Sequence, residues 1–177
     1  MTTRTRTLDQ NDGTLTLRTG VTGRAARMGH RLTIALDSWR ASVTFSADTP
    51  VAASMVIDVD SLRVIDGAGG LTPLTGPEKV LVRGNALKTL AAQRFPTVEF
   101  DAETIEATDA GYRLVGPLTL HGVTRDTAVA VQLTDGTRIS ARAAVSHKNF
   151  RIRPYSMAMG AMKVADEVAI EFNATLR

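Results

Sequence analysis

Apolar and polar residues alternate with a period of two over most of the chain. Because successive side chains of a β-strand point to opposite faces, this alternation predicts strands with one buried face. About eight such runs occur, with turn signals between most of them, which favours an all-β fold with antiparallel pairing. The runs lie at residues 32–36, 43–45, 51–59, 98–102, 114–120, 129–133, 139–145 and 168–176.

One segment follows a helical spacing instead. Thr75, Gly76, Pro77 and Glu78 form the pattern of a capping box, in which a threonine caps the first turn and a glutamate reaches back to it. We predict a helix over residues 77–92. Within it, Gly84 lowers the stability of the helix by about 1 kcal/mol relative to alanine. The positions that recur at helical spacing are Val80, Gly84, Leu87 and Ala91.

Two glycine-containing pairs separate alternating runs. Asp135-Gly136 is a strong signal for a tight hairpin turn. His121-Gly122 interrupts the alternation in the same way, and glycine supplies the positive φ that a hairpin corner often needs. His121 lies on the opposite parity to the inward leucines of the preceding run, so we expect a corner histidine rather than a catalytic one.

Composition indicates that the sheet encloses a hollow. A length of 177 residues favours one domain, and an aromatic content of 5% leaves a mostly aliphatic interior. Small inward side chains leave volume, so we expect an extended, closed barrel of about eight strands with room for a ligand. Several of the small inward side chains are alanines. The alternative is that the barrel narrows at these alanines and that side chains fill its interior. The alanines are Ala41, Ala53, Ala102, Ala141, Ala143 and Ala174.

The common signatures of an enzyme are missing from the sequence. The chain has no cysteine, which removes disulfides, thiolate metal sites and cysteine nucleophiles. It also lacks a Gly-x-Ser-x-Gly elbow and a phosphate-binding loop. The histidines, His30, His121 and His147, are not spaced as metal ligands. We therefore expect no catalytic activity, no metal and no cofactor.

Charge and hydropathy limit the partners. A formal net charge of +3 is too small to indicate nucleic acid. No stretch approaches the ~20 apolar residues of a membrane helix, so we expect no stable membrane insertion. The start of the chain lacks the apolar core of a secretory signal, and we expect a cytoplasmic protein.

Flexible apolar side chains gather near the end of the chain. Met157, Met159 and Met162 precede the last strand, where we expect them at the barrel mouth because methionine adapts to irregular apolar surfaces. Ordinary core or loop packing is the alternative. The residues expected to contact a ligand are Met28, Phe100, Leu118, Leu120, Phe150, Ile152, Met157, Met159 and Met162.

Basic residues accumulate in the same part of the chain. Residues 137–165 include six basic side chains and no acid. A solvated strand face is one interpretation, and a site for an anionic group is the other. The parity shift just before Phe150 implies a bulge or turn that re-aims side chains. We predict that Lys148, Arg151 and Arg153 hold an acidic or diphosphate head group.

Several segments resemble the YceI family of polyisoprenoid-binding, lipocalin-like proteins. The most specific pair is FPTVEF at residues 95–100 with GPLTLHGVTRDTAVAV at 116–131. MVIDVDSLRV, SHKNFRI and DEVAIEFNATL are similar to other strands and turns of that family. The likeness begins near Leu15, which predicts a domain over residues 15–177 after an N-terminal tail over residues 1–14.

The resemblance implies an eight-stranded antiparallel barrel with a helix on its side. It also implies a long apolar tunnel for a polyisoprenoid chain, such as that of a polyprenyl quinone or polyprenyl phosphate, and no established catalytic residues. The front of the chain departs from the family pattern, because only His30 matches its histidines. Residues 66–94 also differ, so the ligand identity does not carry over.

These observations predict non-catalytic binding, storage or transport of a hydrophobic isoprenoid. The alternative function is a protein-interaction or stress-related module with a filled barrel and no small ligand. Exposed edge strands and Trp39 would then supply contacts, including those of a homodimer.

Overall fold

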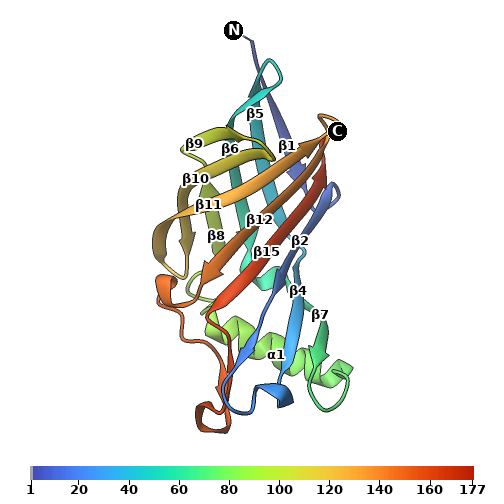
Figure 1. Cartoon of the computed structure of the whole chain (residues 1–177), viewed down its shortest axis with the longest axis vertical. Helices are drawn as coiled ribbons and strands as arrows, with labels where there is room; N and C mark the ends of the chain where they lie inside the picture. Colours follow the sequence, from blue (N-terminus) through green and yellow to red (C-terminus); the bar gives the residue numbers. More distant parts are fainter. Residues whose placement is uncertain (1) are drawn as a thin grey trace.

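The computed structural model describes residues 2–177, which form β-strands, one α-helix and four short 3₁₀ helices (Figure 1). Helix α1 (Gly76–Thr89) crosses the lower part of an elongated, curled sheet. The strands are β1 (Thr3–Asp9), β2 (Gly13–Arg18), β3 (Val21–Thr22), β4 (His30–Leu36), β5 (Trp39–Ser46), β6 (Thr49–Asp58), β7 (Leu62–Gly69), β8 (Thr97–Asp101), β9 (Thr104–Thr108), β10 (Gly111–Leu120), β11 (Val123–Thr134), β12 (Arg138–Ser146), β13 (Ser156–Met157), β14 (Met162–Val164) and β15 (Glu167–Thr175). The 3₁₀ helices are η1 (Ala26–Met28), η2 (Val59–Ser61), η3 (Lys148–Phe150) and η4 (Ala158–Gly160).

Within residues 2–177, twelve strands form one antiparallel sheet. Its order is β1-β5-β6-β8-β10-β11-β12-β15-β2-β4-β7, with β9 added beside β10. Strands β1 and β7 are therefore the two edges of this path. Strands β13, β14 and β3 form a small second sheet.

The expected all-β, antiparallel fold is confirmed, but the sheet contains twelve strands instead of about eight. The eight alternating runs correspond to strands β4, β5, β6, β8, β10, β11, β12 and β15. The strands that the pattern missed in the large sheet are β1, β2, β7 and β9. They are short, largely polar or end in glycines, so they present no long apolar face to recognise.

The first of these corrects the expected N-terminal tail over residues 1–14. Strand β1 pairs with β5 along its whole length, from Thr3 opposite Ser46 to Asp9 opposite Arg40. Leu8 is buried in the main core. Threonine and arginine occupy the other positions of the strand as far as Leu8, so the sequence gives little sign of burial.

The predicted capping box of α1 is present. The Thr75 side chain accepts a hydrogen bond from the Glu78 amide, and the Glu78 carboxylate accepts one from the Thr75 amide. The backbone hydrogen bond from Thr75 is the main cause that holds the pKa of Glu78 below its ordinary value. The helix ends a few residues before the predicted end at residue 92 and packs against β7.

Both predicted hairpin corners are confirmed. His121 and Gly122 have φ values of 55° and 70°, and Asp135 and Gly136 have values of 53° and 66°. Two consecutive residues with positive φ are typical of the type I′ turn that joins neighbouring strands. The corners connect β10 to β11 and β11 to β12.

The inner face of the sheet carries two clusters of buried apolar side chains. The larger includes Leu8, Leu62 and Phe172, and the helix adds partly buried residues to it. The smaller is built around Leu118 and Phe150. Among the described residues, no helix combines the length and apolarity needed to cross a membrane.

Candidate functional site

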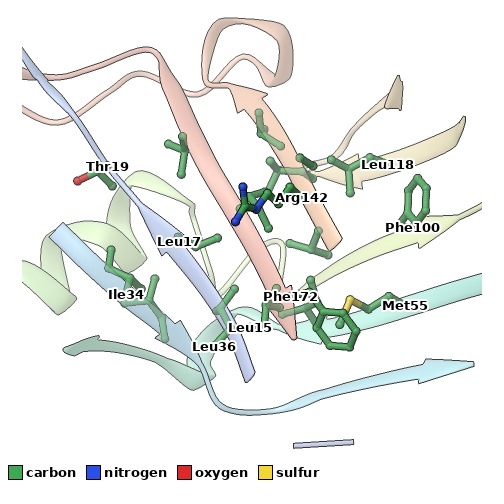
Figure 2. Close-up of a pocket in the computed structure, with 18 of the residues that line it drawn as sticks. Leu15, Leu17, Thr19, Ile34, Leu36, Met55, Phe100, Leu118, Arg142 and Phe172 are labelled. Atoms are coloured by element: carbon green, nitrogen blue, oxygen red, sulfur yellow. The ribbon is translucent and has the colours of Figure 1, made fainter. Parts of the chain in front are cut away.

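The curled sheet encloses a cavity of about 470 Å³, within the ~300–1,000 Å³ range usual for small-molecule sites. Apolar side chains from most strands of the large sheet and from α1 line it (Figure 2). Labelled examples are Leu15, Leu17, Ile34, Leu36, Met55, Phe100, Leu118 and Phe172. The interior is therefore hollow rather than filled.

Small side chains account for part of this volume. Four of the six inward alanines line the cavity, namely Ala41, Ala53, Ala141 and Ala143. Because an alanine projects only one methyl group, opposite walls stay too far apart to close on each other. The expectation that inward alanines leave room is confirmed for these four. Ala102 and Ala174 lie outside the lining.

The cavity extends along the long axis of the molecule. Phe45 and Pro50 line it beside the β5–β6 hairpin, which lies at the upper end in Figure 1. Met28 and Met162 line it at the opposite end, next to the small sheet. Helix α1 contributes Ala86 among other residues. The lining therefore favours an elongated guest over a compact one.

Most of the residues predicted to contact a ligand share this lining. They are Met28, Phe100, Leu118, Leu120, Ile152, Met157 and Met162. Phe150 is buried in the smaller core cluster but does not line the cavity. Met159 is fully exposed and lies outside the lining. It has a left-handed backbone, with φ of 57°, at the tip of the β13–β14 connection.

The three predicted head-group residues do not line the cavity. Lys148, Arg151 and Arg153 are exposed, whereas Phe150 and Ile152 are buried. Arg151 has φ of 55°, so the chain does turn here as the parity shift indicated. The turn directs the apolar residues inward and leaves the charged ones in water, which is the lower-energy arrangement for unpaired charges.

The cavity is also lined by polar side chains that were not assigned to it from the sequence. His30, His147 and Lys163 are its histidines and its lysine. The Nε2 atom of His30 donates a hydrogen bond to the carbonyl oxygen of Thr72 at 2.7 Å. Arg142 also borders the cavity (Figure 2), and its neighbours in the sequence, Ala141 and Ala143, line it as well. Lys163 had a weak signal, because it lies between two apolar residues in the basic part of the chain.

A hydrogen-bond network fixes the turn that carries His147. The Oδ2 atom of Asp166 accepts a hydrogen bond from the Ser146 hydroxyl at 2.5 Å, and Oδ1 accepts one from the Lys148 amide at 2.9 Å. The His147 Nδ1 atom donates to the Asp166 carbonyl oxygen at 2.7 Å. The bond from Ser146, followed by that from Lys148, holds the pKa of Asp166 below its ordinary value.

Neither the corner histidine nor the polar groups form a metal site in residues 2–177. Groups of three or more histidines and carboxylates at metal-binding distances are absent there. His121 instead packs edge-on against Phe95, and its Nδ1 donates to the Phe150 carbonyl oxygen at 3.2 Å. This ties the β10–β11 corner to the turn that follows β12.

A curled antiparallel sheet around a largely apolar cavity defines a fold built to enclose hydrophobic ligands. The chain belongs to the YceI-like domain family, whose sequence profile matches residues 7–176. This confirms the resemblance in the β8 and β10–β11 segments. A comparison with curated proteins gives no match.

Solved structures share the fold at low sequence identity. Burkholderia cenocepacia BcnA aligns with a TM-score of 0.68 and 19% identity, over 96% of this chain and 99% of its own. A polyisoprenoid binding domain from Saccharophagus degradans, implicated in plant cell wall breakdown, aligns with a TM-score of 0.58 and 13% identity, over 97% and 96% of the two chains. A Campylobacter jejuni YCEI protein gives a TM-score of 0.56 and 16% identity, over 81% and 84%.

Proposed function

We propose that this protein binds an isoprenoid lipid inside the sheet and stores or transports it without chemical change. The observation that carries the proposal is the elongated cavity, which is lined mainly by apolar side chains. Transfer of such a chain from water is favourable by about 25 cal/mol for each Å² of apolar surface buried. A prenyl chain has no polar atoms, so an aliphatic lining leaves nothing unsatisfied.

The isoprenoid class is supported by the family and by the name of one structural neighbour, the polyisoprenoid binding domain of Saccharophagus degradans. The alternative function as a protein-interaction module requires a filled interior, which the cavity disfavours. Binding without catalysis also suits a site whose surface is mainly side-chain carbon.

Native mass spectrometry of the purified protein mixed with a polyprenyl quinone or a polyprenyl phosphate tests the proposal. We expect a one-to-one complex that survives desalting. Ala143→Leu narrows the cavity and should lower the bound fraction, because its side chain lines the site. Ala144→Leu, on the other face of β12, is the matched control. Equal binding by both variants, or no complex with the unmodified protein, contradicts the proposal.

The position of the head group can be tested separately. The sequence predicts that Lys148, Arg151 and Arg153 contact the head group. In the structure, however, Lys163 is the lysine that lines the cavity. We propose that an anionic head group contacts one or more of these four basic side chains. Comparing polyprenyl phosphate affinity in Lys163→Gln with that in the triple glutamine variant of the other three identifies the contact. An uncharged polyprenol should bind both variants equally.

The cytoplasmic location and the absence of a nucleic-acid partner stay predictions, as does a homodimer. Cell fractionation tests the location, and sedimentation of the purified protein tests the oligomeric state. Edge strands β1 and β7 are the surfaces that a dimer would pair.

A further inference from the structure

The lower end of the molecule is formed by three segments, residues 21–31, 69–75 and 153–165, which we call the lower mouth (Figure 1). They hold one another in place. The Ala25 amide donates to the Ala161 carbonyl oxygen at 2.9 Å, and Val21 pairs with Val164. His30 bonds the Thr72 carbonyl oxygen. The same segments contribute lining residues at this end of the cavity.

Large apolar side chains of the lower mouth face water. Met28 is 55% exposed, Leu71 is 77% exposed and Met157 is 50% exposed, and Met159 is fully exposed. Two of them, Met28 and Met157, also line the cavity, so the apolar surface continues from the outside to the interior. Exposed apolar side chains at the rim of an apolar cavity are typical of a surface that contacts a partner.

The charged side chains within the three segments of the lower mouth all have one sign, and the acids that flank them in the sequence are Asp66, Glu78 and Asp166. The segments contain five basic residues and no aspartate or glutamate, and all five are exposed. The five positive charges of these segments exceed the net charge of +3 for the whole chain, so the rest of the protein has a net negative charge. The ion pairs within residues 2–177 involve other side chains. The five are Arg24, Arg27, Arg31, Arg153 and Lys163.

We propose that the lower mouth docks reversibly on the surface of a membrane that contains anionic lipids, so that the cavity opens onto the bilayer. Exposed methionines next to unpaired arginines match the two layers of such a surface, because the apolar groups enter the acyl boundary while the cations meet the head groups. A second protein of acidic, apolar character would match the charge but not the continuity with a lipid-sized cavity. The inference rests on the proposed function in one respect, which is the reason why docking would be useful to the protein.

Flotation of ligand-free protein with vesicles tests the proposal. We expect strong binding to phosphatidylcholine vesicles that contain phosphatidylglycerol, weak binding to phosphatidylcholine alone, and loss of binding as salt is raised. Arg24→Gln with Arg27→Gln should lower the partition coefficient by about fivefold for each residue replaced, the usual effect of one basic side chain near an anionic membrane. Met157→Ser with Met159→Ser should also lower it, by removing the apolar contact.

Matched controls lie elsewhere on the surface. Arg113→Gln removes an exposed charge from β10, and Val51→Ser removes an exposed apolar side chain from β6. Both should bind vesicles as the unmodified protein does. Equal flotation of mouth and control variants overturns the proposal, as does self-association through Met157 and Met159 without vesicle binding. Vesicle binding by a protein that takes up no isoprenoid would instead refute the proposed function and leave docking intact.

Discussion

Phe172 packs edge-to-face against Trp39, with ring centroids 4.9 Å apart and an interplanar angle of 83°. Phe172 lines the cavity, whereas Trp39 is buried behind it and is the one tryptophan of the chain. The Phe172 side chain therefore contacts both the ligand space and a natural fluorophore.

The emission of Trp39 should report on cavity occupancy. We expect a polyprenyl quinone to quench the emission and an uncharged polyprenol to shift it slightly, because each changes the environment of the Phe172 ring. Titration at fixed protein concentration measures the affinity. In Phe172→Leu the response should shrink while binding, followed by mass spectrometry, persists. An unchanged spectrum at saturating ligand would show that the guest lies elsewhere.

Replacement of Gly122 by alanine should destabilise the protein more than the same change at Gly136. Both glycines have positive φ, so each substitution costs about 1 kcal/mol from backbone strain. A Cβ at Gly122 would also lie 2.5 Å from the Phe95 ring, whereas nothing lies within 4 Å at Gly136. We expect an additional loss of about 1–3 kcal/mol at Gly122. Urea unfolding of the two variants gives the comparison, and equal losses would contradict it.

Loss of the helix cap should loosen one wall of the cavity. Thr75→Ala removes the side-chain acceptor of the Glu78 amide and should cost about 1 kcal/mol. For a chain of this size, that corresponds to a fall in Tm of about 2–4 °C. Hydrogen exchange should quicken in α1, which carries the lining residues Val82 and Ala86. Thr134→Ala, at an exposed position of β11, should change neither quantity.

The Asp166 network should contribute to stability at neutral pH and lose its contribution in acid. Hydrogen bonds to the carboxylate lower its pKa in the folded state, so the stabilisation is present above the ordinary carboxyl pKa. It is lost as the pH falls through the lowered folded value. Ser146→Ala removes the largest cause and should raise the pKa of Asp166, as measured by carbon NMR of the carboxyl group. Ser156→Ala is the control, and the same pKa in both variants would contradict this assignment.

The alternating pattern and the turn chemistry predicted the fold well, because both are local. Each long run became a strand, and the glycine corners and the capping box formed as expected. Strand β1 was missed because its stability comes from pairing with β5, a contact between residues 31 to 43 positions apart in the sequence. Such pairing leaves no apolar signature in a stretch of threonine and arginine.

The candidate site was predicted less completely, since it depends on which way each side chain points after a turn. The parity shift before Phe150 predicted the turn, but it could not predict that Lys148, Arg151 and Arg153 are all exposed beside the buried Phe150 and Ile152. Lys163 reaches the cavity because β14 pairs with β3, a strand of two residues that no pattern marks. Long-range pairing again decides the position.

Strands β1 and β7 end the hydrogen-bonded path at opposite edges of the sheet, and the backbone pairings of residues 2–177 do not join them to each other. A fully closed ladder has its girth set by strand number and stagger. No backbone pairing among the described strands sets the distance between β1 and β7, so that distance can change without breaking a hydrogen bond of the sheet. The space that the sheet encloses can therefore widen or narrow with the size of the bound molecule.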